Sequence, residues 1–191
     1  MKSGNSASCC EARVSCGGAS THTAADTLLG HNIEAVATAI PALTTERLSN
    51  PTFAGPADPL TGIAAEWQPT CNCQGDLRCQ LTPGMSLSGN ESQLIQRYGF
   101  LEEGILQTGR SVRKGETLEV ELWAKARHRP VPLQFEICPM PARQPAYDTA
   151  RVTVDAAYWK RYTVRLAVPC DDDTAVFKCL LLDEGTLWID Q

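Results

Sequence analysis

The sequence predicts an all-β fold, an antiparallel β-sandwich preceded by a short strand and helix segment and a disordered N-terminal tail. Apolar and polar residues alternate with period two in several short stretches after residue 91, and turn residues separate these stretches. No helical pattern of any length follows residue 48. Short strands in this number, with turn signals between them, are typical of two packed antiparallel sheets.

The stretch 104–127, GILQTGRSVRKGETLEVELWAKAR, gives the clearest register. It predicts two antiparallel strands joined by a glycine-containing turn. In the second strand every other residue is apolar: Leu118, Val120, Leu122, Ala124 and Ala126. The alternate positions hold Glu119, Glu121, Trp123, Lys125 and Arg127. One face therefore belongs to a core, and the other is either a solvated surface with one aromatic residue or the floor of a binding groove.

The other strands follow from the same pattern. They are expected at residues 91–98, 131–138, 150–154, 161–168, 176–182 and 186–189. Phe135 alternates with polar residues and is expected in the core, and Trp159 and Trp188 are expected there because their neighbours are apolar. Residues 50–82 are rich in proline and glycine and are expected to be irregular, with Trp67 as their one large apolar anchor.

The chain divides into three expected segments. Residues 1–24 are mostly Ser, Gly, Ala, Thr and Cys with little periodicity, which is typical of a disordered tail. Residues 25–47 combine a short apolar strand, a polar GHNIE segment and a weak helix. Residues 48–191 form the sandwich.

Composition excludes several classes of protein. The chain has 191 residues, 43% of them hydrophobic, which is enough for a substantial core. Its 17 basic and 22 acidic residues give a net charge of −5 without any basic run, so nucleic acid is not an expected partner. No apolar window approaches the ~18 residues of a spanning helix, and no signal peptide is visible. We expect a soluble chain, cytoplasmic by default, or secreted if its N-terminus is incomplete.

Nine cysteines occur in three uneven groups: Cys9, Cys10 and Cys16; Cys71, Cys73 and Cys79; and Cys138, Cys170 and Cys179. Neither of the first two groups has the paired C-x2-C spacing or the nearby histidine of a closed zinc site. Reduced cysteines are the favoured interpretation. A disulfide from Cys79 to Cys71 or Cys73 stays open for an exported protein.

Six pieces of sequence occur in a recognisable order between residues 50 and 190: LSNPTF, Trp67, SGNESQLIQ, GILQTGRSVRKGETLEVELWAKA, AYWKRYTVRL and GTLWID. This order resembles the jelly-roll carbohydrate-binding modules of families four and nine. The resemblance implies a jelly roll that binds a plant-type polysaccharide or an arabinose-containing glycan. It also implies a structural calcium held by Asp190, but Ala54 stands where such modules often carry a second ligand, a glutamate. No other cofactor is expected.

The upstream segments LLGHNIEAV and TTERLSNPTFAG are similar to the beginning of the family fifty-one α-L-arabinofuranosidases. The resemblance implies that residues 25–47 start a catalytic barrel, a partner domain of the same polypeptide, and that Glu34, His31 and Asn32 contact its substrate. From composition alone, these three residues cap a turn. Neither catalytic glutamate of this retaining family has a candidate segment here, so the chain alone is expected to be inactive.

The sequence is compatible with two functions. In the first, the sandwich binds a glycan through Trp123 and Glu121, flanked by Gln134 on the next strand. In the second, the sandwich is a structural insert that packs on the hydrolase barrel, covers Trp123 and binds no glycan. Both interpretations place the residues that perform the hydrolysis outside this chain.

Overall fold

A computed structural model describes residues 46–70, 76–87, 91–99, 101–141 and 145–190. These residues belong to one compact unit, 44–191. The predicted tail, most of segment 25–47 and several predicted residues lie outside the described part of the chain: His31, Asn32, Glu34, Cys9, Cys10, Cys16, Cys71 and Cys73. No helix of the described residues is long and apolar enough to cross a membrane.

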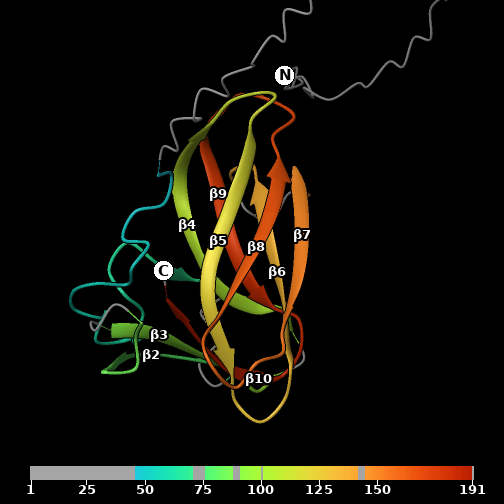
Figure 1. Ribbon diagram of the computed structural model, residues 1–191. Coiled ribbons are helices and arrows are strands. Elements are labelled where there is room, and N and C mark those ends of the chain that lie inside the picture. The colour runs from blue at the N-terminus through green and yellow to red at the C-terminus, as the bar shows by residue number, and fades with distance from the viewer. Residues whose placement is uncertain (1–45, 71–75, 88–90, 100, 142–144, 191) are drawn as a thin grey trace, which may run out of the picture. The chain divides into compact units, whose positions relative to one another are not determined.

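The described residues form ten strands and their connections, which confirms the predicted fold class (Figure 1). The first sheet has the order β1-β4-β9-β6-β7, and the second sheet has the order β2-β3-β10-β5-β8, with every pairing antiparallel. The strands are β1 (Gln68–Pro69), β2 (Leu77–Pro83), β3 (Glu91–Arg97), β4 (Glu103–Val112), β5 (Thr117–Ala126), β6 (Val131–Cys138), β7 (Asp148–Val154), β8 (Lys160–Ala167), β9 (Asp172–Leu181) and β10 (Gly185–Asp190).

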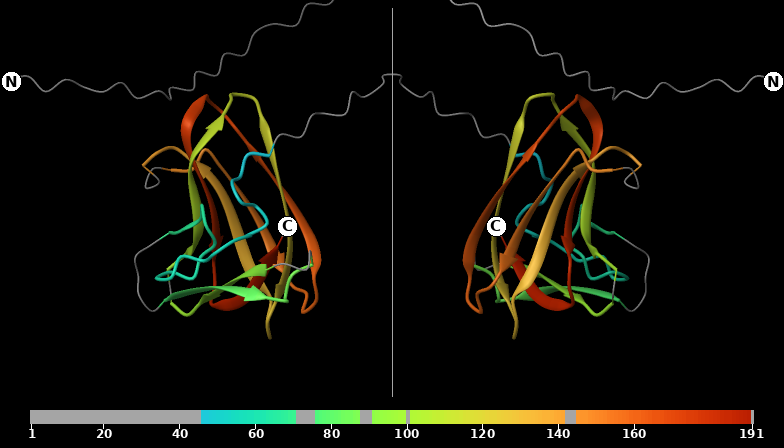
Figure 2. Two further views of the ribbon diagram at one scale, coloured as in Figure 1. Left: turned by 90° about the vertical axis from the view of Figure 1, so that its left-hand side faces the viewer. Right: turned by 90° about the vertical axis from the view of Figure 1, so that its right-hand side faces the viewer.

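The two sheets pack face to face, and the core fills the space between them (Figure 2). Period-two alternation directs one side chain in two inward, so that Leu122, Phe135 and Phe177 meet there. The rings of Phe135 and Phe177 stack with centroids 6.2 Å apart. Phe135 is only 2% exposed, which confirms its predicted place in the core.

The predicted hairpin over residues 104–127 is wrong. β4 pairs with β1 and β9 in the first sheet, whereas β5 pairs with β8 and β10 in the second (Figure 1). The turn at Arg113–Glu116, with Gly115 at φ 84°, therefore joins the two layers. Alternation tells which face of a strand is buried but not which strand borders each edge, and here both strands bury their apolar faces against the opposite sheet.

Residues 46–67 form a strap that packs onto the sandwich, and they are more ordered than the sequence suggests (Figure 2). Phe53 and Trp67 are buried, and their rings stack at 5.2 Å. Trp67 is thus the anchor that was predicted. β2 was missed within this irregular region, although Leu77, Cys79 and Leu81 alternate there, because the run is short and ends at a proline.

Two fully buried glutamines hold the strap, one from each sheet. Gln93 of β3 accepts a hydrogen bond from the Ala64 amide at 2.9 Å and donates to the Gly62 carbonyl at 3.3 Å. Gln107 of β4 accepts from the Ser49 amide at 3.0 Å and donates to the carbonyl of the same residue. Each amide thus satisfies backbone groups that have no strand partner.

Candidate functional site

The outer face of the second sheet carries three of the chain's four tryptophans. Trp123 lies on β5 and Trp188 on β10, and both point outward because their strand neighbours point into the core. Trp159 immediately precedes β8. The pairing of β10 with β5 sets Trp188 directly opposite Lys125, and Trp123 lies between Asp190 and its β8 partner Arg161. We call this surface the tryptophan face.

Lys125 occupies the centre of the tryptophan face. Its Nζ lies 4.6 Å from the centroid of the Trp159 ring and 5.3 Å from the centroid of the Trp188 ring. Both distances are within the range of a cation–π contact. Burial lowers the pKa of Lys125, since the indoles displace water from its ammonium group.

Ion pairs occupy the β5–β8 side of the face. Glu119 pairs with Arg165 at 2.9 Å, and Glu121 pairs with Arg161. All four side chains are well exposed, so these pairs add little to stability. They place planar hydrogen-bonding groups next to Trp123, and the face therefore combines aromatic rings with polar side chains that can reach a ligand.

Trp159 and Trp188 do not lie in the core as predicted. Both are half-buried on the outer face, whereas Leu187 and Ile189 on either side of Trp188 point inward. When the residues on either side of a strand residue are apolar and buried, that residue itself points to the outer face, because successive side chains alternate. Applying period two strictly to WID and YWK would have placed these indoles on the outer face, although not beside Lys125, because that position depends on the pairing of the strands.

Gln134 does not lie beside Trp123 and Glu121, because β6 belongs to the first sheet. Its side chain is on the outer surface of that sheet, where it accepts from Arg151 Nε at 2.6 Å and donates to Glu136 at 2.6 Å. Glu136 in turn forms an ion pair with Lys178, whose Nζ lies 3.0 Å from Glu136 Oε2. The predicted single surface of these three residues is therefore wrong, for the same reason as the predicted hairpin: the alternation does not specify the sheet.

Asp190, the predicted calcium ligand, is buried, and its Oδ2 accepts a hydrogen bond from the Leu87 amide at 2.8 Å. Calcium takes about six to eight oxygen ligands. Among the described residues, no three His, Cys, Asp or Glu side chains lie together as a metal site. The turn that ends at Ala54 is held instead by Asn50, whose side chain bonds the Ala54 amide at 2.8 Å and the Ala54 carbonyl at 2.9 Å. Within the described part of the chain, Asp190 therefore belongs to no group of three metal-ligating side chains.

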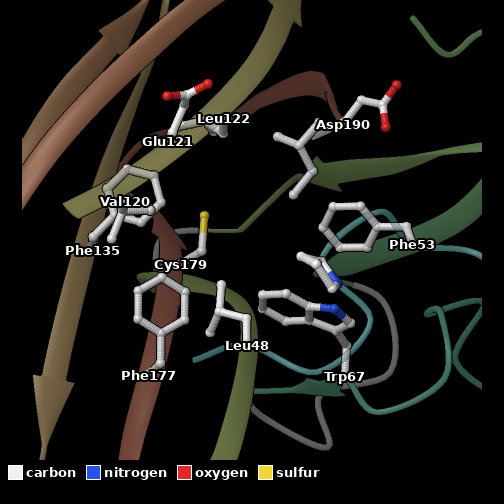
Figure 3. Close-up of a pocket in the computed structure, with 12 residues that line it drawn as sticks. Leu48, Phe53, Trp67, Val120, Glu121, Leu122, Phe135, Phe177, Cys179 and Asp190 are labelled. Carbon is white, nitrogen blue, oxygen red and sulfur yellow. The ribbon is translucent and has the colours of Figure 1, made fainter. Parts of the chain in front are cut away.

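A small cavity of about 40 Å³ lies between the strap and the two sheets (Figure 3). The Cys179 sulfur points into it, and burial raises the pKa of that thiol to about 12. The carboxylates of Glu121 and Asp190 point away from it. This volume corresponds to a few water molecules at most. This space is small for a sugar ring, so the tryptophan face is the better candidate site.

The fold defines the class of the chain: a two-sheet β-sandwich of the kind found in carbohydrate-binding modules. Its structure is similar to an arabinose-bound α-L-arabinofuranosidase (TM-score 0.59, 14% identity, 75% of this chain and 25% of that chain). It is also similar to a family-four carbohydrate-binding module, with a TM-score of 0.52 and 18% identity over 75% of this chain and 95% of that chain. For a putative sugar-binding protein from Bacteroides thetaiotaomicron the TM-score is 0.57 and the identity 13%, over 76% of this chain and 97% of that chain.

These identities establish the fold alone. The sequence matches no family model and no curated protein. The chain spans only a quarter of the arabinofuranosidase but nearly all of the two smaller proteins, so the likeness concerns the sandwich.

Proposed function

We propose that this chain is a glycan-binding module and that it binds through the tryptophan face. One observation carries the proposal: Trp123, Trp159 and Trp188 lie on one outward sheet surface and are not part of the hydrophobic core. Large aromatic side chains on an outer face are typical of a binding surface. The similar structures of sugar-binding proteins support this assignment.

The chemistry of the face suits a sugar. A sugar ring has an apolar face of C–H groups that can stack on an indole, and its hydroxyl groups need planar donors and acceptors at the edge. Glu121 and Arg161 supply an acceptor and a donor next to Trp123. Such a site gains affinity from ring contact and orientation from a few polar groups.

We further propose that the ligand is an arabinose- or xylose-containing polysaccharide and that the sandwich is attached to a hydrolase barrel. The structural likeness to an arabinose-bound arabinofuranosidase supports this context. His31, Asn32 and Glu34 would then belong to the barrel and contact its substrate. Retaining hydrolysis needs two carboxyl groups about 5–5.5 Å apart, and we propose that the chain alone does not hydrolyse arabinofuranosides.

A structural role is the second candidate. The indoles of Trp159 and Trp188 already contact Lys125, so this cluster could serve to pack the sandwich against a barrel. The two functions differ in what the isolated chain does: a packing surface binds no polysaccharide, whereas a glycan site does.

Affinity gel electrophoresis tests the proposal, with arabinoxylan, xylan and a β-glucan in separate gels. We expect retardation of the wild-type chain on at least one glycan. Trp123→Ala should weaken it about tenfold or more, because loss of a central aromatic contact usually has an effect of this size. Met140→Ala, at a site 54% exposed outside the tryptophan face, is the control and should bind as the wild type does.

Two results would contradict the proposal. Absence of retardation on every glycan would favour the structural role. Retardation that survives substitution of each of the three outward tryptophans would place the site elsewhere on the molecule.

A further inference from the structure

The charge on the tryptophan face carries an inference that rests on the proposed function and makes its ligand more specific. We propose that Lys125 recognises the carboxylate of a uronic acid, so that the face prefers acidic glycans over neutral ones.

Lys125 differs from the other cations beside it. Arg161 and Arg165 each form an ion pair with a glutamate of β5. Within the described part of the chain, no carboxylate pairs with the Lys125 ammonium, which faces two aromatic rings instead. Asp190 is buried and accepts the Leu87 amide. A ligand is thus the available source of an anion for Lys125.

The centre of the face also contains an orphaned donor. Trp188 Nε1 is buried and has no hydrogen-bond acceptor among the residues that the structure describes. A buried donor without an acceptor costs free energy, and a partly desolvated ammonium favours a nearby anion. Lys125 and Trp188 lie together and are both donors. An anionic acceptor is the ligand chemistry that complements the Lys125 ammonium, whereas another donor would not.

The charge balance of the face differs from that of the chain. The chain carries a net charge of −5, which repels an acidic polymer. On the outward positions of the second sheet, however, cations outnumber carboxylates. The cations there are Arg78, Lys125, Arg161 and Arg165, and the carboxylates are Glu119, Glu121 and Asp190. The tryptophan face therefore does not share the negative charge of the whole chain, and Lys125 is a cation there that has no glutamate partner among the described residues.

The aromatic surroundings select the kind of anion. A uronic acid joins a carboxylate to a sugar ring, so the ring can stack on an indole while the carboxylate reaches the ammonium. A charge-assisted hydrogen bond in a partly desolvated site is stronger than a neutral one. A small inorganic anion would gain the charge contact without the stacking.

The test compares two ligands that differ only in charge: glucuronoxylan and the same polymer after chemical reduction of its carboxyl groups to primary alcohols. We expect the wild-type chain to bind the acidic form about tenfold more tightly, the lower end of the range for a hydrogen bond to a charged group. This preference should shrink at high salt, where the screening length falls from about 10 Å at 0.1 M to about 3 Å at 1 M.

Two variants assign the preference to the residue. Lys125→Met keeps the apolar stem between the indoles but removes the charge, and it should bind both polymers equally. Lys125→Arg keeps the charge and should retain the acid preference. Thermal unfolding of each variant checks that the sandwich is intact. We expect little change, since neither substitution alters a core position.

The outcomes separate this inference from the proposed function. If the wild-type chain binds neither polymer, the proposed function fails. If it binds both equally, glycan binding stands and the role of Lys125 is wrong. An acid preference that persists in Lys125→Met would likewise overturn the inference, because another cation would then be responsible.

Discussion

Phe135 and Trp159 show that strand position, rather than side-chain size, decides which aromatic residues are buried. Phe135 is 2% exposed and stacks on Phe177 from the neighbouring strand β9. Trp159, equally apolar in its sequence surroundings, is half-buried outside and contacts the Lys125 ammonium. One residue therefore contributes to the core, and the other remains available to a ligand.

This difference predicts unequal losses of stability. Phe135→Ala should lower the free energy of unfolding by about 3–5 kcal/mol, the cost of a large cavity in a packed core. Trp159→Ala should lower it by only about 1 kcal/mol, since it removes a surface contact and a cation–π interaction. Urea unfolding of both variants measures these losses. Equal losses would show that the two faces of the sandwich have been wrongly assigned.

At the scale of elements, the strap and the layer-crossing turn were the hardest features to predict. The strands themselves follow from alternation, and β6 and β8 lie close to where the sequence places them. The pairing of β4 and β5 does not, because proximity in the chain favours a hairpin but the burial of both inner faces requires two sheets. The strap is fixed by Gln93 and Gln107, whose burial leaves no periodic signal.

The strap offers a prediction of its own. Asn50 adopts φ 47° and bonds Ala54 twice and the Ala65 carbonyl once, at 2.8–2.9 Å. Asn50→Ala removes these hydrogen bonds. It also puts alanine in a left-handed conformation, which asparagine tolerates better because its side chain forms local hydrogen bonds. The free energy of unfolding should therefore fall by about 2 kcal/mol. Chemical denaturation measures the change.

Leu60→Ala is the matched control for the strap. Leu60 belongs to the same segment but is 93% exposed, and its substitution should change the free energy of unfolding by less than about 0.5 kcal/mol. If Asn50→Ala were as stable as this control, the strap would be held by its apolar anchors alone.

For the whole molecule, the sequence was sufficient for the fold class and for half of the candidate site. Trp123 and Glu121 were predicted on an outward face, and the structure places both on the second sheet. Trp159, Trp188 and the central position of Lys125 required the cross-strand register, which a single chain read by periodicity does not contain. The sequence places Gln134 on this face because β6 follows β5 in the chain. In the folded protein the two strands belong to different sheets.

We propose that the glycan binds to the tryptophan face, rather than to the core or the opposite sheet. The four indole N–H signals of the chain in a ¹⁵N correlation spectrum test it most directly, during titration with xylan-derived and glucuronoxylan-derived oligosaccharides. Trp67 is an internal control, because its Nε1 donates to the Asn50 carbonyl at 3.0 Å inside the strap. We expect the signals of Trp123, Trp159 and Trp188 to shift with the oligosaccharide and that of Trp67 to stay unchanged. Shifts confined to Trp67, or no indole shift under conditions where the oligosaccharide binds, would contradict it.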